Sequence, residues 1–175
     1  MKNTKKITFC AIMSALATVI MLVSYFPYFT YAVPAVAGLC VMAVLIEFGA
    51  KWSVLNYLTS AFLAFLFAET ESKLIYIAFF GFYPIIKCFI EKINKSIIEW
   101  IIKIVVFNLC VITLYSVFSK LLMFDINEFG KFAEYGVIGL LVLANIVFVF
   151  YDIAVTRLAQ TYVFKLHPKI EKFLK

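Results

Sequence analysis

The sequence has few charged residues, and long stretches contain none. Only 15% of the 175 residues are charged, whereas a soluble domain has about 25%. Between Ile7 and Ile46 there is no Asp, Glu, Lys or Arg, and hydrophobic residues make up 65% of the chain. The mean hydropathy is +1.03. Because this composition cannot form a water-compatible surface, we expect lipid to surround most of the chain.

The chain also lacks the motifs of metal, haem and nucleotide sites. His167 is the single histidine, and the four cysteines (Cys10, Cys40, Cys88 and Cys110) lie in apolar segments without a CxxC pair. We therefore expect no metal and no cofactor. There is no GxxxxGK[ST] phosphate loop. The net charge is +6, but no basic run interleaved with aromatics lies outside the apolar segments, which argues against nucleic-acid binding.

The apolar runs predict transmembrane helices. About 20 apolar residues cross a bilayer, and backbone groups in lipid must form their hydrogen bonds within the segment. The uncharged stretch from Ile7 to Ile46 is long enough for two crossings, with a break at Pro27, where neighbouring tyrosines suit the interface. We predict an all-α membrane protein that forms one domain, 1–175. Its six transmembrane helices cover about 7–26, 32–48, 52–68, 74–90, 97–121 and 135–163.

The basic residues predict the direction in which the chain is threaded. With six spans, thirteen of the 16 Lys and Arg residues lie on the side of the two chain ends, and Lys73, Lys120 and Lys131 lie on the other. Lys and Arg favour the cytoplasmic side of a membrane. We therefore expect both termini inside the cell (N-in/C-in) and the 1–2, 3–4 and 5–6 loops outside.

Polar side chains are costly in hydrocarbon and tend to mark function. In the last three predicted spans they recur at helical spacing: Tyr76, Tyr83 and Lys87, then Asn108, Tyr115 and Ser119, then Asn145 and Asp152. Such spacing places each set on one helix face. The three faces either line a shared polar interior or bond between helices.

Asp152 is the one acidic residue of the sixth predicted span. Lys87, Lys103 and Asp152 all lie within about 10 Å of the expected inner surface, at about 1.5 Å rise per residue. We therefore expect a structural ion pair between Asp152 and Lys87 or Lys103. The alternative is that both lysines extend to water.

Residues nearer the expected outer face are the candidates for ligand binding. Aromatic side chains with a few convergent polar groups are typical of small-molecule pockets. The candidates are Tyr31 in the 1–2 loop, Glu69 in the 3–4 loop, and Tyr76, Tyr115, Lys120 and Asn145 in the outer halves of the last three spans. Each of them can instead anchor its helix at the interface.

Small residues mark the first predicted helix. Ala11, Ser14, Ala15 and Ala17 are expected on one side of it, with Ala11 and Ala15 four residues apart. This small-xxx-small spacing lets another helix approach closely. The face either docks on a partner protein or packs against a helix of the same chain.

With these features the chain resembles the S components of energy-coupling factor (ECF) transporters, which bind vitamins and trace nutrients for bacterial uptake. The similarity lies in the size, the six predicted helices with both ends inside, and the opening Lys5-Lys-Ile-Thr-Phe-Cys-Ala-Ile-Met-Ser-Ala15. In that opening a basic end precedes a helix with an AxxxA motif. The resemblance implies a multi-pass protein of the bacterial plasma membrane. Its ligand pocket would open outward between the last three helices, beneath the 1–2, 3–4 and 5–6 loops.

The resemblance also implies partners. Ala11 and Ala15 would dock on a transmembrane coupling subunit driven by two cytoplasmic ATPases, and the chain itself would not be an enzyme. No vitamin-specific signature is present, so the identity of the nutrient stays open. Two other functions stay open as well. One is an intramembrane enzyme, against which Asp152 counts as the only acidic residue of its predicted span. The other is a structural or assembly protein of the cell envelope.

Overall fold

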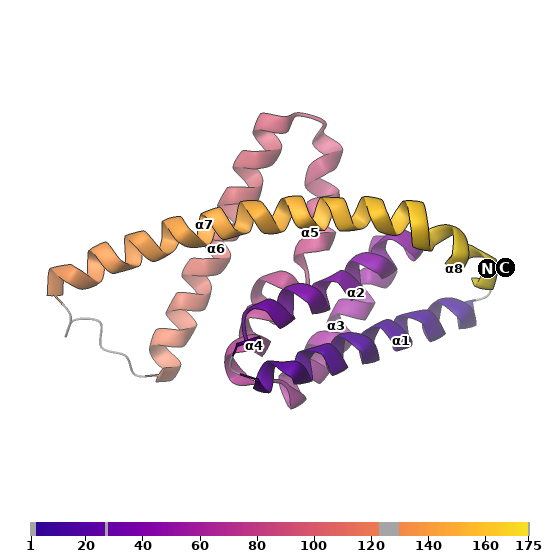
Figure 1. Ribbon diagram of the computed structural model, residues 1–175, viewed down its shortest axis with the longest axis horizontal. Helices are drawn as coiled ribbons and strands as arrows, with labels where there is room; N and C mark the ends of the chain where they lie inside the picture. Colours follow the sequence, from indigo (N-terminus) through magenta and orange to yellow (C-terminus); the bar gives the residue numbers. More distant parts are fainter. Residues whose placement is uncertain (1–2, 27, 123–129, 175) are drawn as a thin grey trace.

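A computed structural model of the chain describes the backbone of residues 3–26, 28–122 and 130–174. It describes the side chains of residues 3–26, 28–116, 139 and 141–170. The described backbone is helical almost throughout and contains no β-strand. The all-α prediction is therefore confirmed for this part of the chain. Figure 1 shows a bundle of three helices, a hairpin rising from it, and a long helix lying across both.

The helices follow the predicted apolar segments. They are α1 (Asn3–Leu22) with a 3₁₀ turn (Val23–Tyr25), α2 (Ala32–Phe48), α3 (Ala50–Phe67), α4 (Thr70–Ile75), the π-helical turn η2 (Tyr76–Phe80), α5 (Tyr83–Ile90), the 3₁₀ turn η3 (Glu91–Ile93), α6 (Ser96–Leu122), α7 (Gly130–Thr161), the π-helical turn η5 (Tyr162–Leu166) and α8 (His167–Leu174). The predicted range 32–48 coincides with α2. The other predicted ranges differ from the observed bounds at their ends.

Small side chains let α1, α2 and α3 pack closely. Ala17 of α1 and Ala64 of α3 are completely buried in this contact, and residues of this size allow two helix backbones to approach. Asn56 of α3 adds hydrogen bonds to α1, because its Nδ2 donates to the Cys10 carbonyl oxygen (2.9 Å) and to Ser14 Oγ (2.7 Å). These contacts help to hold together the three-helix bundle α1–α3 seen in Figure 1.

The fourth predicted span is an interrupted helix. After α4, the Gly81 N–H donates to the Tyr76 carbonyl oxygen (2.8 Å) in the π-helical turn η2, and α5 follows. Pro84 has no N–H to offer the Phe80 carbonyl four residues earlier, which explains why the helix breaks here. The Phe80 carbonyl oxygen instead packs against Gly38 of α2, where an added Cβ would lie 2.4 Å from it.

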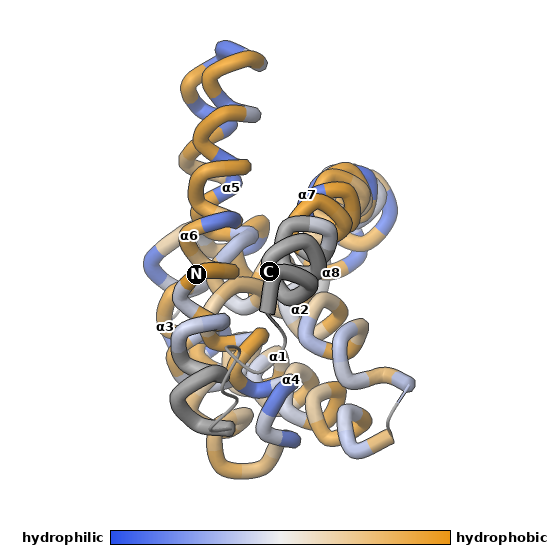
Figure 2. The backbone as a smooth tube through the Cα atoms, turned by 90° about the vertical axis from the view of Figure 1, so that its left-hand side faces the viewer, coloured by the Kyte–Doolittle hydropathy of each residue, from blue (hydrophilic) through white to orange (hydrophobic). Residues whose placement is uncertain are grey.

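The remaining helices extend from this three-helix bundle. α5 and α6 form a hairpin that rises away from α1–α3, with Asn94 in the left-handed conformation (φ 55°) at its turn. α7 has 32 residues and crosses α6. Figure 2 shows that apolar residues run along α5, α6 and α7. The start of α1 and the end of α8 lie at the same end of the molecule (Figure 1).

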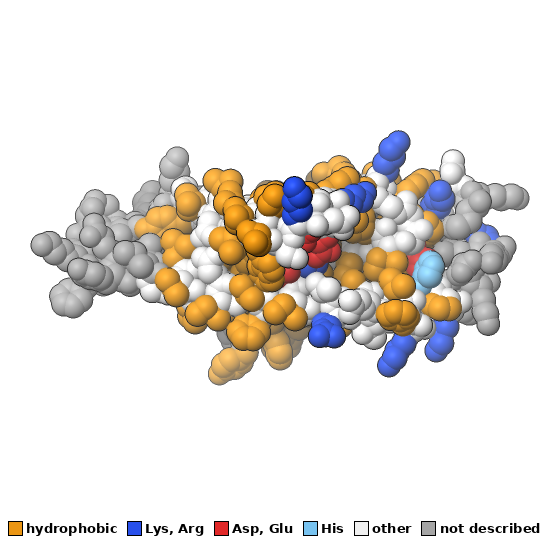
Figure 3. Space-filling view, turned by 90° about the horizontal axis from the view of Figure 1, so that it is seen from above, with side chains coloured by type: hydrophobic (Ala, Val, Ile, Leu, Met, Phe, Trp, Pro, Cys, Tyr) orange, Lys and Arg blue, Asp and Glu red, His pale blue; other side chains and the backbone are white. Residues whose placement is uncertain are grey.

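The described chain has the helices of a membrane protein. Four helical stretches are long and apolar enough to cross a membrane: Asn3–Tyr25, Thr70–Ile93, Ser96–Ser116 and Leu141–Ile170. The apolar helix α2 is shorter, with 17 residues. Figure 3 shows apolar side chains over much of one face, and the Lys and Arg side chains visible on that face lie in the half that carries the histidine. Such extensive exposed apolar surface suits lipid rather than water. Six crossings and their direction stay predictions.

Candidate functional site

Asp152 of α7 is the centre of a buried cluster of charged side chains. Its Oδ2 accepts a hydrogen bond from Lys103 Nζ of α6 (3.0 Å), and its Oδ1 accepts one from Lys87 Nζ of α5. Tyr83, one turn before Lys87, donates its hydroxyl to the same Oδ1 (2.5 Å). The three charged side chains are at most 6% exposed. The structure therefore places both predicted lysines on Asp152, where the sequence prediction required only one.

Glu91 of η3 completes the cluster from its more exposed side. Its Oε1 lies 2.9 Å from Lys87 Nζ and 2.9 Å from Lys103 Nζ, and its side chain is 40% exposed. Two cations and two anions leave the cluster neutral, which offsets part of the cost of burying charge. We interpret it as a structural link among α5, η3, α6 and α7. Within the described residues, no group of His, Cys, Asp and Glu has the makeup of a metal site.

A pair of carboxamides forms a second polar link between α6 and α7. Asn108 Nδ2 donates to Asn145 Oδ1 (3.0 Å), and Asn145 Nδ2 donates to Asn108 Oδ1 (3.1 Å). Both side chains are half-buried. Asn145, a predicted ligand residue, therefore takes part in the interhelical bonding that the sequence left open as the alternative.

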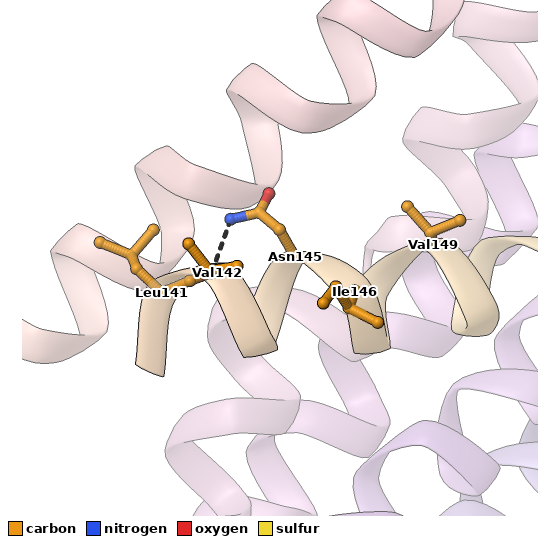
Figure 4. Close-up of a pocket in the computed structure, with 5 residues that line it drawn as sticks. All are labelled: Leu141, Val142, Asn145, Ile146 and Val149. Carbon is orange, nitrogen blue, oxygen red and sulfur yellow. Dashed lines mark hydrogen bonds between the residues drawn. The ribbon is translucent and has the colours of Figure 1, made fainter. Parts of the chain in front are cut away.

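A groove runs along α7 beside this amide pair. Its volume is about 520 Å³, within the range of about 300–1,000 Å³ that small-molecule sites occupy. The groove is largely open to the outside, and all of its described lining belongs to α7. Its lining consists of one carboxamide and four aliphatic side chains: Leu141, Val142, Asn145, Ile146 and Val149. In Figure 4 the Asn145 side chain points from α7 toward α6. Of the predicted ligand residues that the structure describes, Asn145 alone lines this groove.

Tyr76 lies in the core instead. Its side chain is completely buried, and its hydroxyl is 2.7 Å from Ser60 Oγ of α3. The prediction that Tyr76 and Tyr83 share one helix face is wrong, because Tyr83 reaches Asp152 on α7. The π-helical turn between the two tyrosines adds a residue to one turn and so rotates all that follows. Spacing along the sequence does not reveal such a turn.

Two other predicted ligand residues, Tyr31 and Glu69, make local contacts near α4. The Tyr31 hydroxyl donates to Glu71 Oε2 (3.1 Å), and the Glu69 carboxylate caps α4 by accepting the Ser72 N–H (3.3 Å). Partial burial and the hydrogen bond to Glu71 raise the pKa of Tyr31, so its phenol stays protonated and can donate.

The last two candidates lie on α6. Tyr115 is 44% exposed, and the Lys120 side chain lies outside the described residues. The described candidates are therefore spread over the core, the α4 end, the surface of α6 and the groove. They do not line one common space.

The small residues of α1 occupy two faces rather than one. Ala11 and Ala15 are exposed, whereas Ser14 and Ala17 are buried inside the three-helix bundle (3% and 0% exposed). The prediction that all four share one side is therefore wrong. Ser14 faces Asn56 of α3, so packing within the chain uses this face and leaves the Ala11/Ala15 face open in the described part of the molecule.

The sequence predictions did not include a second buried carboxylate, that of Glu47. The Glu47 side chain, at the end of α2, is 2% exposed. Its Oε1 accepts the Tyr162 hydroxyl (3.1 Å) and lies 3.0 Å from His167 Nδ1. Because these partners follow Glu47 by 115 and 120 residues, no local spacing could have indicated the contact. Glu91, by contrast, follows Lys87 by four residues, the spacing at which helical side chains meet.

No protein-family model, curated protein or solved structure matches this chain. The groove, the charged cluster and the open face of α1 are therefore the features of the described chain that bear on its function.

Proposed function

We propose that the chain is the substrate-binding S component of an ECF-type importer in a bacterial plasma membrane. It captures a vitamin or another small nutrient from outside and docks on a transmembrane coupling subunit. Two cytoplasmic ATPases then drive uptake, and the chain itself catalyses no reaction. The observation that carries the proposal is the ligand-sized groove at Asn145. It adjoins the contact between α6 and α7, two of the helices to which the resemblance assigns the pocket.

The proposal requires six crossings with both chain ends inside the cell. The contacts at the two ends of the three-helix bundle support this threading. At one end Glu47 contacts His167, which joins the α2–α3 turn to the carboxyl-terminal segment. At the other end the Tyr31 hydroxyl bonds to Glu71, which joins the expected 1–2 and 3–4 loops. Segments expected on the same side of the membrane therefore lie together.

Cysteine labelling tests this threading. In a variant without the native cysteines, Tyr28→Cys lies in the expected outer loop, where Tyr28 is 94% exposed. Asn94→Cys lies in the expected inner turn between α5 and α6. A membrane-impermeant maleimide should label intact cells at position 28 and label position 94 only after permeabilisation. Labelling of position 94 in intact cells would refute the threading and the importer with it.

The open face of α1 supports the second part of the proposal. A coupling subunit needs a surface that the chain does not already use, and the Ala11/Ala15 face is exposed. The small side chains at these positions would let a helix of the coupling subunit lie close to α1.

Ligand-induced stabilisation tests the binding function directly. A compound that binds only the folded protein stabilises it by about 2.7 kcal/mol at 100-fold excess over its dissociation constant. A thermal-shift screen of vitamins and cofactor precursors on the detergent-purified chain should therefore yield a concentration-dependent rise in Tm. If no compound raises the Tm and mass spectrometry finds no co-purified small molecule, the chain is not a nutrient receptor. A structural or assembly role in the cell envelope then becomes the better assignment.

A further inference from the structure

Three segments that are far apart in the sequence meet at the end of the molecule where both termini lie (Figure 1). They are the start of α1, the turn between α2 and α3, and the carboxyl-terminal segment, here residues 3–10, 43–58 and 161–170. The Phe9 ring of α1 packs edge-on against the Phe48 ring at the end of α2, with the ring centroids 5.3 Å apart. Beside Phe48, Glu47 contacts His167 at the start of α8. These contacts join the three segments into one end of the molecule.

Each of the three segments brings lysines to this end. We call the four lysines Lys6, Lys51, Lys165 and Lys169 the basic end. Three of them are exposed, and Lys6 is half-buried. Lys6 Nζ lies 5.7 Å from the centroid of the Trp52 ring of α3, and Lys51 directly precedes this tryptophan. Trp52 therefore has one cation over its ring and another next to it in the sequence.

Acidic residues do not balance these lysines. Among the described residues of the three segments, Glu47 is the one acidic residue. Its side chain is 2% exposed and already contacts His167. The adjoining residues 1–2 and 171–175 contain three lysines and one glutamate in the sequence, so they add positive charge as well. The charge of this end therefore favours an anionic partner.

Exposed apolar side chains adjoin the lysines along the helices. Ile7, which follows Lys6, is 55% exposed, and Leu55, one turn after Trp52, is 50% exposed. Tryptophan is enriched where the acyl chains of a bilayer meet the headgroups, and lysines there extend toward the headgroups. An acidic soluble protein would meet the lysines alone. An anionic phospholipid matches both the cations and the apolar surface beside them.

We propose that the basic end binds anionic phospholipids, with their phosphates at the lysines and their acyl chains along the adjoining surfaces of α1 and α3. Each lysine near an anionic membrane surface strengthens association about fivefold. Basic surfaces between transmembrane helices are known to bind such headgroups. The inference does not rest on the proposed function, because a structural protein of the cell envelope would present the same surface.

Trp52 provides a local probe of the lipids at this end. The chain has two tryptophans, so Trp100→Phe leaves Trp52 as the single one. This full-length variant is reconstituted in bilayers of phosphatidylglycerol and phosphatidylcholine with the same acyl chains. In separate samples one lipid or the other carries bromine on its acyl chains near the headgroup. Because bromine quenches tryptophan only at short range, the fluorescence reports which lipid lies beside Trp52.

We expect brominated phosphatidylglycerol to quench Trp52 more strongly than brominated phosphatidylcholine at the same mole fraction. The difference should correspond to a preference of at least about fivefold for the anionic lipid. The preference should fall as the salt concentration rises, because salt screens charges near water. Bilayers in which both lipids are brominated give the maximal quenching of each variant and so correct for any change in the depth of Trp52.

Two double variants, made in the same Trp100→Phe background, locate the preference. Lys6→Gln/Lys51→Gln removes the two cations beside the probe and should make quenching by the two lipids equal. Lys92→Gln/Lys95→Gln removes the same charge at exposed positions of the turn between α5 and α6, at the tip of the hairpin in Figure 1. This matched control should keep the preference. Unfolding midpoints in neutral detergent should be the same for both double variants.

Each contrary result would overturn the inference. Equal quenching by the two lipids in the parent would show that the basic end does not select anionic lipid. A preference that survives Lys6→Gln/Lys51→Gln, or one that the control loses equally, would assign it to the net charge of the chain. Failure of bilayers with both lipids brominated to quench Trp52 would show that it does not face lipid, and a partner protein would then be the better occupant. A clear preference together with a failed vitamin screen would leave this inference standing and remove only the importer.

Discussion

Lys103 of α6 and Asp152 of α7 are in contact although 49 residues separate them in the sequence, with Lys103 Nζ 3.0 Å from Asp152 Oδ2. Their side chains are 5% and 4% exposed. Each charge alone would be costly to bury, and their contact offsets part of that cost. Because Lys87 approaches the other oxygen of the same carboxylate, one acidic side chain holds three helices together. Asp152 should therefore contribute more to stability than either lysine does.

The first prediction concerns the loss of this carboxylate. Asp152→Asn leaves two buried ammonium groups with Glu91 as their remaining counter-charge. Removal of one partner from a buried pair costs about 3–5 kcal/mol, so the free energy of unfolding in mixed micelles should fall by about that amount. Arg157→Gln removes a charge from an exposed position of the same helix and should change it by less than about 0.5 kcal/mol. Equal effects of the two substitutions would show that the cluster does not stabilise the fold.

Charge exchange provides a second, independent prediction. Asp152→Lys should destabilise more than Asp152→Asn, because it brings three buried ammonium groups together. The double variant Asp152→Lys/Lys103→Glu restores the charge balance and should recover part of the lost stability, which a double-mutant cycle measures. Asp152→Lys with Lys87→Glu serves as the parallel exchange. If neither double variant is more stable than Asp152→Lys alone, the ion pairs contribute nothing measurable.

The third prediction tests the close approach between α2 and the interrupted helix. Gly38→Ala places a Cβ 2.4 Å from the Phe80 carbonyl oxygen, which forces the two segments apart and should cost about 1–3 kcal/mol, as overpacking does. Gly139→Ala is the matched control. An added Cβ there meets nothing within 4 Å, and alanine favours a helix over glycine by about 1 kcal/mol. Unfolding midpoints measured in the same detergent should therefore move in opposite directions.

Apolar patterning was sufficient to predict that the described chain is helical and where most of its long helices lie. The stretch 32–48 shows why: Pro34 suits the first turn of α2, and Gly49, with φ 81°, ends the helix in a conformation that favours glycine. The charged cluster was partly predictable because Lys87, Lys103 and Asp152 are rare charges in apolar surroundings. Both the helix ends and the charged cluster were therefore indicated by the types of the residues that form them.

Features that depend on tertiary structure were not predictable in this way. The π-helical turn Tyr76–Phe80 changes which face Tyr83 presents. Pro84 indicates that the helix is interrupted, but it does not indicate that the interruption includes a π-helical turn. The contact of Glu47 with Tyr162 depends on how distant segments pack. The exposure of Ala11 likewise depends on which side of α1 packs against the other helices. The sequence pattern identified the small residues but could not show which of them stay accessible.

The last prediction uses that accessibility to test docking. Ala11→Trp or Ala15→Trp places a large side chain on an exposed position, so the chain should fold and bind ligand as before. The bulk should nevertheless prevent a helix of the coupling subunit from approaching α1, and co-purification with that subunit should be lost. Ala154→Trp introduces the same change at an exposed position of α7 and should leave co-purification intact. Loss of ligand binding together with docking would mean that the Ala11/Ala15 face serves the fold of the chain itself, whereas docking that survives both substitutions would place the coupling interface on another helix.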